Sequence, residues 1–334
     1  MKSIASEHAF LAEGFRVWTY RSIRDSGFVP LACLTALVGR EQSGKTNLLG
    51  ALAGLDPRAR SPYSAARDWP RGRRPQPNGD QVICALNLRL HPSVRDGLVN
   101  DGLLRPEAVG IRVGRTYDQQ FRVTAVDDLI LRRTSNQLAD WDDHDESLHG
   151  YVLDRLPELL FGSAGSLLPD RIELDDLLAS RDPAWDGDQD RAEQVGLRAL
   201  ASLLGLRPGD DADEAKLSLV RDLDHRVTDL NRVLEQLELG PQLKIGEHQG
   251  QIKIAIRTEN GSKPIAQMAP ARRLQLTLDL RIAAAHARTR VTPALLLDAP
   301  GKAFKGGFKR RLRPALLGYA NAGVPVIYSS RLPF

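Results

Sequence analysis

The amino-acid sequence predicts an α/β fold, and three observations lead to this prediction. A glycine-rich loop lies between an apolar run typical of a buried strand and a run typical of a helix, within residues 34–53. Strands and helices alternate again towards the carboxyl end of the sequence. Residues 150–240, in contrast, have mostly helical periodicity. We therefore expect one split α/β domain that carries an inserted helical lobe.

The composition is that of an ordinary globular protein. The 334 residues suffice for a large core, and 42% hydrophobic and 26% charged residues are typical proportions. The sequence has no apolar run of about 18 residues and no basic-then-apolar signal at its start, so we expect a cytoplasmic protein without a membrane span. Cys33 and Cys84 lack metal-site spacing and are expected to be buried thiols. The net charge of +4 permits nucleic-acid contact without arguing for it.

The glycine-rich loop has the spacing of a phosphate-binding P-loop, because four residues separate Gly39 from a Gly-Lys-Thr run that begins at Gly44. Glycines let backbone N–H groups converge on a phosphate, and the helix that follows turns its positive end towards it. The lysine reaches the outer phosphates, and the threonine hydroxyl can bind Mg²⁺. The sequence therefore predicts a nucleotide site, with these contacting residues: Gly39, Arg40, Gln42, Ser43, Gly44, Lys45, Thr46 and Asn47.

Strands are also predicted around this loop. They cover residues 15–23, 81–90, 109–113 and 121–126, and the last three suggest a small antiparallel sheet. Between them, residues 56–80 are rich in proline, glycine and arginine, which predicts an exposed loop. The arginines between Arg67 and Arg74 have two interpretations, a solvated linker or a basic edge near phosphates or DNA.

The middle of the chain is predicted to be helical. Residues 141–146, Trp-Asp-Asp-His-Asp-Glu, are acidic with one histidine, and we expect a solvated loop there rather than a metal site. An apolar seam with alternating spacings of three and four follows, formed by Val220, Leu223, Val227, Leu230, Leu234 and Leu237. The seam is too short for a coiled-coil rod, so we expect a packed helical lobe that ends at Gly240.

The last hundred residues return to an α/β pattern. The predicted elements are a hairpin within 243–257, a helix at 267–287, a strand at 294–297, a basic helix at 308–320 and a strand at 324–328. The domain boundaries predicted from these patterns are 1–140 for the first part of the α/β domain, 141–240 for the inserted lobe and 241–334 for the second part.

The apolar strand that ends at Asp298 has the pattern of a Walker B motif. A buried strand delivers its last carboxylate to the edge of the sheet, where the carboxylate can hold Mg²⁺ opposite the P-loop. Paired with the upstream P-loop, this motif predicts Thr46 and Asp298 as the magnesium-side residues.

Together these motifs resemble those of the ABC-type ATPases, in particular the group that includes the OLD (overcoming lysogenization defect), SMC and RecF proteins. The resemblance lies in residues 20–23, 37–49, 295–301 and 326–334. It implies the P-loop NTPase fold of an ABC-type head that binds ATP and Mg²⁺. In that family two heads sandwich ATP, each P-loop faces the signature motif of the other head, and members serve in DNA maintenance or defence against phage.

Several positions depart from the family pattern. Ala299 follows Asp298 where the family has the glutamate that activates water, and Arg331 stands at the position of the switch histidine. The stretch that corresponds to the signature, 264–273, has Ala269 and Ala271 in place of the expected serine and glycine. The histidine-rich loop is replaced by residues 302–305. Because a methyl group neither polarises water nor donates to a phosphate, these departures predict weak or absent hydrolysis.

One further family feature has several candidate residues in this sequence, and another is not expected. The glutamine that senses the γ-phosphate has three candidates, Gln76, Gln81 and Gln119. The sequence also has no acidic nuclease module after the switch position, so we do not expect the nuclease activity of OLD proteins.

The resulting expectation is an ATP-binding head that assembles with itself or with a heteromeric ATPase or effector partner. An alternative is an active, DNA-linked ATPase of the same group that uses a non-standard acid, Glu259 or Asp279. DNA contact would use the basic residues between Arg67 and Arg74 and between Lys305 and Arg313.

Overall fold

The computed structural model describes most of the chain. The chain divides into two compact units. The described residues are 9–59, 62–72, 79–127, 141, 146–163, 167–169, 171–181, 192–259, 261–300 and 308–331. One unit, which we call the P-loop unit, contains residues 5–161, 291–299 and 317–334, and the other, the helical unit, contains residues 162–290 and 300–316. The two units are described separately below.

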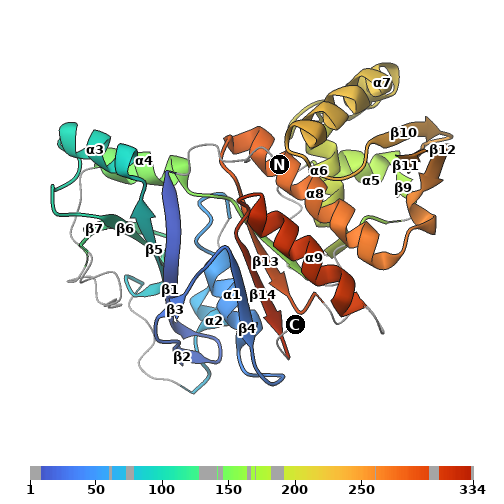
Figure 1. Ribbon diagram of the computed structural model, residues 1–334. Helices are drawn as coiled ribbons and strands as arrows, with labels where there is room; N and C mark the ends of the chain where they lie inside the picture. Colours follow the sequence, from blue (N-terminus) through green and yellow to red (C-terminus); the bar gives the residue numbers. More distant parts are fainter. Residues whose placement is uncertain are drawn as a thin grey trace. The chain divides into compact units, whose positions relative to one another are not determined.

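A mostly parallel sheet forms the first layer of the P-loop unit (Figure 1). Its strand order is β4-β14-β13-β8, and β14 pairs in parallel with both β4 and β13. The bounds are β4 Leu34–Val38, β8 Leu159–Ser163, β13 Ala294–Asp298 and β14 Val326–Ser330. The parallel arrangement brings the carboxyl ends of β4, β13 and β14 to one edge of the sheet.

An antiparallel sheet forms the second layer, in the order β2-β1-β5-β6-β7, with β3 paired to β1. Its strands are β1 Phe10–Tyr20, β2 Ile23–Asp25, β3 Val29–Pro30, β5 Val82–Leu90, β6 Gly110–Thr116 and β7 Phe121–Val126. The helices of this unit include α1 Lys45–Ala53, α2 Ala65–Asp68, α3 Pro92–Asn100 and α4 Glu146–Arg155. The antiparallel sheet predicted from the sequence is thus present.

Helix α1 packs between the two sheets, because it contacts β1 and β5 on one side and β13 and β14 on the other. Its buried residues Leu49 and Leu52 share a core with Phe15 of the antiparallel sheet and with Leu296 and Ile327 of the parallel sheet. The apolar core therefore fixes the helix that follows the P-loop against both layers.

Two predictions for this unit are wrong. The predicted strand 15–23 is two strands, because the chain turns after Tyr20 with Arg21 at φ 50°, and Ile23 begins β2. The predicted exposed loop 56–80 includes α2 and three buried side chains, those of Asp56, Tyr63 and Asp68.

The helical unit combines helices with a small antiparallel sheet in the order β10-β11-β12, with β9 paired to β11. The strands are β9 Ile172–Glu173, β10 Leu243–His248, β11 Gln251–Thr258 and β12 Gly261–Pro264. The helices are α5 Leu174–Ala179, α6 Ala192–Leu203, α7 Ala212–Gln236, the 3-10 helix η3 Ile265–Gln267 and α8 Pro270–Thr289. A last helix, α9 Phe308–Asn321, leads back to β14.

The predicted apolar seam is correct over most of α7 and wrong at its start. Val220 is 44% exposed, and Leu219 is buried in its place. Asp211 caps the helix by accepting hydrogen bonds from the backbone N–H groups of Asp213 and Glu214. The seam therefore begins one residue earlier than its spacing indicated.

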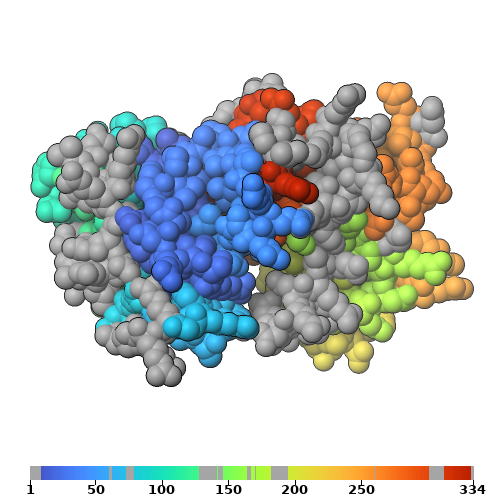
Figure 2. All heavy atoms as spheres, turned by 90° about the horizontal axis from the view of Figure 1, so that it is seen from below, coloured from blue at the N-terminus to red at the C-terminus, as the bar shows by residue number. Residues whose placement is uncertain are grey.

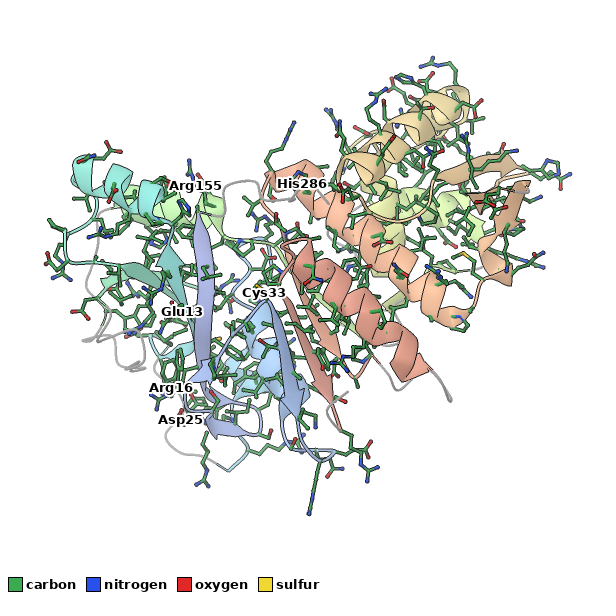
Figure 3. All side chains as sticks on the ribbon, viewed as in Figure 1. Glu13, Arg16, Asp25, Cys33, Arg155 and His286 are labelled. Atoms are coloured by element: carbon green, nitrogen blue, oxygen red, sulfur yellow. The ribbon has the colours of Figure 1, made fainter. Side chains whose placement is uncertain are left out.

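Smaller differences concern element ends and one cysteine. The hairpin turn is only Gln249 and Gly250, both at positive φ, and β11 extends one residue beyond the predicted hairpin, to Thr258. Helix α8 begins at Pro270 rather than at 267, because proline suits the first helical position. Cys84 is buried as expected, and burial raises the pKa of its thiol, but Cys33 is exposed (Figure 3).

Two sequence expectations concern metals and membranes. Residues 142–145 of the acidic stretch lie outside the described residues. Within the described ranges, no group of three or more His, Cys, Asp or Glu side chains is placed to hold a metal ion. None of the helices in the described part of the chain is long and apolar enough to cross a membrane. The α/β class predicted from the sequence is confirmed, because a parallel sheet, an antiparallel sheet and α1 packed between them are all present.

Candidate nucleotide site at the P-loop

The loop between β4 and α1 has a backbone that requires its two glycines. Gly44, the N-cap of α1, has φ 88°, which side chains with a Cβ rarely adopt. A Cβ at Gly39 would lie 2.9 Å from the hydroxyl oxygen of Ser43, closer than such contacts allow. The loop is tied to the sheet at its start, where the Gly39 N–H donates to the Ser330 carbonyl at 3.2 Å.

The ammonium group of Lys45 lies over the loop. Its Nζ donates to the carbonyl oxygens of Gly39 at 2.8 Å and Arg40 at 2.6 Å, and to the Ser43 hydroxyl at 3.1 Å. All three acceptors are neutral, so a phosphate placed here would offer the ammonium a stronger, charged acceptor. The lysine is therefore held where an anion on the loop would meet it.

The loop is open to solvent. Arg40, Gln42, Ser43 and Thr46 are all exposed. Figure 2 shows the segment coloured blue, which includes β4 and this loop, at the surface of the P-loop unit. The first turn of α1 has no acidic residue, and no side-chain hydrogen bond caps the helix among the described residues. The positive end of α1 is thus accessible to an anion.

Thr46 and Asp298 meet beside the loop. The Thr46 hydroxyl donates to Asp298 Oδ2 at 2.9 Å, although 252 positions separate the two residues in the sequence. The other carboxylate oxygen, Oδ1, accepts a hydrogen bond from the Ser329 hydroxyl at 2.6 Å. A hydroxyl and a carboxylate are hard oxygen ligands of the kind that Mg²⁺ prefers, and Mg²⁺ commonly takes only one or two protein ligands together with substrate phosphates. The donor set therefore fits Mg²⁺.

Ala299 occupies the position directly after this carboxylate. Its N–H donates to the Ser329 hydroxyl oxygen at 2.8 Å, and its backbone has φ 44°, in the left-handed region that is unusual for alanine. Its side chain is a methyl group, which cannot accept a proton from water. No general base is therefore supplied by the residue next to Asp298.

Asn47 and Gln42 contribute to the shape of the loop, one through a side-chain hydrogen bond and the other through its backbone conformation. The Asn47 side-chain N–H donates to the Ser22 hydroxyl at 2.8 Å, which ties the first turn of α1 to the turn after β1. Gln42 has φ 62°, so the loop has two left-handed residues two positions apart, Gln42 and Gly44.

The signature and switch candidates lie at element ends. Ala269 is the exposed N-cap of α8 in the helical unit, and Ala271 is in the first turn of that helix. Arg331 is exposed and directly follows β14 in the P-loop unit. Residues 302–305, the counterpart of the histidine-rich loop, lie outside the described residues.

The candidates for the sensing glutamine differ in their surroundings. The side-chain N–H group of Gln119 donates to the carbonyl oxygens of Tyr63 at 2.5 Å and Tyr117 at 3.0 Å, so this amide binds the protein itself. Gln81 directly precedes β5, and Gln76 lies outside the described residues.

The alternative catalytic acids lie in the helical unit. Asp279 is 1% exposed within α8, and Glu259 is exposed directly after β11. A buried carboxylate has no access to bulk water, so Asp279 is poorly suited to activating a water molecule for attack.

The basic stretches are only partly described. Arg67 donates to the Asp68 carboxylate and to the Pro62 carbonyl, so its guanidinium already has acceptors. The structure does not describe Arg73, Arg74 or residues 305–307. It describes the backbone of residues 308–311 but not their side chains.

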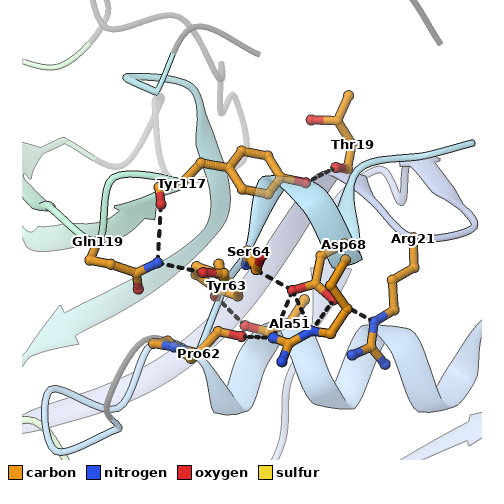
Figure 4. Close-up of polar contacts among 10 residues, drawn as sticks. Thr19, Arg21, Ala51, Pro62, Tyr63, Ser64, Asp68, Tyr117 and Gln119 are labelled. Atoms are coloured by element: carbon orange, nitrogen blue, oxygen red, sulfur yellow. Dashed lines mark hydrogen bonds and ion pairs between the residues drawn. The ribbon is translucent and has the colours of Figure 1, made fainter. Parts of the chain in front are cut away.

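Two features of this site could not be predicted from the sequence. The first is the role of Ser329 as a partner of Asp298, which requires β14 to lie beside β13. The second is the cluster around Asp68, which connects the turn after β1 to α1 (Figure 4). The only sequence signal for the cluster was one tyrosine and one aspartate in a proline-rich stretch.

Comparisons with known proteins found structural likeness without sequence matches. No family model matches the chain, and no curated protein does either. Many solved structures resemble it, and three of them do so over 96% of this chain and 89% of the other chain. They are an SMC head bound to the C-winged helix domain of ScpA, an SMC head domain from Thermotoga maritima, and an SMC head with an extended coiled coil bound to the C-terminal domain of ScpA derived from Pyrococcus furiosus. Their identities are 12%, 12% and 13%, with TM-scores of 0.43, 0.39 and 0.46. The chain is thus loosely similar to SMC heads, and its function is inferred below from the contacts at the P-loop.

Proposed function

We propose that this chain is an ATP-binding ABC-type head that holds ATP with Mg²⁺ at the P-loop and hydrolyses it weakly or not at all. One observation carries the proposal: Lys45, Thr46 and Asp298 converge at a glycine loop that is open to solvent. These are the groups that a triphosphate with its metal requires.

The phosphate end of the nucleotide would be bound by three features of this chain. Backbone N–H groups of the glycine loop would donate to the phosphate oxygens, and the uncapped start of α1 would add its positive dipole. Lys45 would exchange its neutral carbonyl acceptors for anionic phosphate oxygens, which adds an attraction between opposite charges to each hydrogen bond.

Mg²⁺, when bound, would neutralise phosphate charge, and Thr46 and Asp298 would hold it. Their oxygens lie 2.9 Å apart, so both could bind one small cation once the Thr46 hydroxyl rotates and no longer donates its proton to Asp298. Asp298 keeps its orientation through the Ser329 hydroxyl.

Weak hydrolysis follows from Ala299. Loss of a general base typically lowers a rate by about 10²–10⁴-fold, and the methyl group offers no replacement. ATP would then act mainly as a ligand that stabilises an assembly, because a ligand that binds only the engaged state shifts the population towards that state. We propose assembly with a second copy or with an ATPase or effector partner, in DNA maintenance or phage defence.

The Lys45→Ala variant tests this proposal. Calorimetric titration of the wild-type protein with Mg²⁺-ATP should give saturable binding, and Lys45→Ala should abolish it because the outer phosphates lose their cation. A Lys253→Ala variant removes an exposed lysine from β11 and should bind like the wild type. If Lys45→Ala retains the wild-type affinity while folded, the proposal is wrong.

The alternative is an active ATPase that takes its acid from elsewhere, with Glu259 as the more accessible candidate. It predicts steady-state phosphate release at about 1 s⁻¹ or more, well above the Lys45→Ala control. A turnover of that size would replace the proposal of a binding head with that of an enzyme.

A further inference from the structure

A short segment after α1 contacts both this helix and the turn between β1 and β2. This segment, residues 62–69, contains Tyr63 and α2, and we call it the brace (Figure 4). The P-loop motif includes none of its residues. The contacts of its two buried polar side chains, those of Tyr63 and Asp68, lead step by step to the P-loop.

Asp68 has a fully buried side chain with several donors around it. Its carboxylate accepts hydrogen bonds from Arg21 Nε at 2.8 Å, from Arg67 Nη2 at 2.8 Å and from the Ser64 N–H at 2.9 Å. Burial alone would raise the pKa of Asp68, but the hydrogen bonds from Arg67, Arg21 and Ser64 outweigh burial and hold the pKa below its usual value. Asp68 is therefore a buried anion that needs its partners.

Arg21 is held by both the side chain and the backbone of Asp68. In addition to the ion pair, the Arg21 N–H donates to the Asp68 carbonyl at 2.5 Å. Arg21 has φ 50°, a left-handed conformation that is unfavourable for an L-residue with a side chain. The bonds to Asp68 stabilise this turn between β1 and β2.

The next residue, Ser22, connects the turn to the P-loop. Its hydroxyl accepts the hydrogen bond from Asn47 in the first turn of α1 at 2.8 Å. A Cβ built on Gly44 would lie 3.4 Å from the same hydroxyl oxygen, so Ser22 lies beside the last glycine of the loop. A shift of the turn would therefore be transmitted to both residues.

Tyr63 fixes the brace to the other end of α1. Its hydroxyl donates to the Ala51 carbonyl at 2.5 Å, and a Cβ on Gly54 would lie 2.4 Å from its ring. The Gln119 amide in turn donates to the Tyr63 carbonyl (Figure 4). The brace thus has one attachment near the carboxyl end of α1 and a second, through Arg21 and Ser22, at its start.

We propose that Asp68 is a positioning residue for the nucleotide loop: by holding the Arg21–Ser22 turn against Gly44 and Asn47, it keeps the P-loop in the shape that binds phosphate. This inference rests on the proposed function, since it assigns a second set of residues to the same site. Asp68 itself touches no nucleotide in this account.

The Asp68→Asn variant tests the inference. Asparagine keeps the size of the side chain but cannot neutralise two arginines, so the turn loosens and Mg²⁺-ATP affinity should fall about tenfold, the size typical of lost supporting contacts. Asp25→Asn is the matched control. Asp25 also pairs with an arginine of the same hairpin, Arg16 at 2.8 Å (Figure 3), but both side chains are partly exposed to solvent. The Asp25→Asn variant should therefore bind Mg²⁺-ATP with the wild-type affinity.

A double variant distinguishes positioning from general destabilisation. Ser22→Ala removes the next contact in the same series, so Asp68→Asn combined with Ser22→Ala should lose no more affinity than the weaker-binding single variant. Ser22 is exposed, so Ser22→Ala is expected to fold and, measured alone, should still weaken binding if Asp68→Asn does not fold. Three results would overturn the inference. The first is a double variant whose loss of affinity equals the product of the two single losses, and the second is a Ser22→Ala variant with unchanged affinity. The third is an Asp68→Asn variant with a lower melting temperature but wild-type affinity.

The same titrations separate this inference from the proposed function. If the wild-type protein shows no Lys45-dependent binding of ATP, the proposed function fails. If Lys45-dependent binding is present and Asp68→Asn leaves it unchanged, only the role of Asp68 fails.

Discussion

Ser329 determines the orientation of the Asp298 carboxylate, which we propose as a ligand of Mg²⁺. Its hydroxyl donates to Asp298 Oδ1 at 2.6 Å and accepts the Ala299 N–H at 2.8 Å, and it is 1% exposed. With Oδ1 occupied, Oδ2 is the oxygen that faces Thr46. One buried hydroxyl therefore fixes both the carboxylate and the backbone that follows it.

Replacing Ser329 should affect the magnesium-dependent part of the affinity. A hydrogen bond to a charged group contributes about 1.5–3 kcal/mol, so Ser329→Ala should weaken ATP binding about tenfold in Mg²⁺ and much less in excess chelator. Calorimetric titrations under the two conditions measure the difference. Ser180→Ala, which removes an equally buried serine that bonds within α5, is the control. An equal loss with and without Mg²⁺ would show that Ser329 acts on the fold rather than on Asp298.

At the residue scale, the sequence predicted the local chemistry but not the partners. The spacing of the P-loop identified Lys45 and Thr46, and the strand pattern identified Asp298. The contact between Ser329 and Asp298 depends on the pairing of β13 with β14, which one sequence does not specify. The left-handed backbone of Ala299 was equally hidden, because alanine gives no signal for positive φ.

At the element scale, helix α7 shows what periodicity can and cannot determine. Leu223, Val227, Leu230 and Leu234 are buried as predicted. The start of the seam was ambiguous because apolar residues stand at 217, 219 and 220, and packing selects Leu219. Periodicity identifies the buried face, whereas the tertiary contacts decide its first member.

This arrangement predicts opposite outcomes for two leucines on α7. Leu219 is fully buried and Leu217 is 73% exposed. Leu219→Ala should lower the free energy of unfolding by about 2–5 kcal/mol because it leaves a cavity, and Leu217→Ala should change it by less than about 0.5 kcal/mol. Denaturant unfolding of the two variants checks both values. Comparable losses would mean that the face of α7 has been assigned wrongly.

The brace is the element that the sequence described least well. Prolines, glycines and arginines in residues 56–80 favoured a solvated loop, and the composition gave no reason to expect a buried aspartate. Burial of Asp68 depends on the adjacent Arg67 and also on Arg21, which lies 47 positions earlier in the sequence. Composition rules fail where a distant partner neutralises a charge.

At the scale of the whole molecule, the motif residues are divided between the two units. The P-loop, Asp298 and Arg331 belong to the P-loop unit, whereas Ala269 and Ala271 begin α8 in the helical unit. Ala269 has no side-chain oxygen, so it cannot cap the first N–H groups of α8 as serine would. The domain boundaries predicted from the sequence stay a prediction, and so does the partner with which a nucleotide-bound head would assemble.

The central claim is that the chain binds ATP and hydrolyses it weakly or not at all. The most direct measurement incubates the wild-type protein with Mg²⁺-ATP, removes free nucleotide and determines the chemical state of what remains bound. The account predicts retained nucleotide that is mostly ATP, and none in the Lys45→Ala variant. Retention of ADP with phosphate release at about 1 s⁻¹, or no retained nucleotide in the wild-type protein, would contradict it.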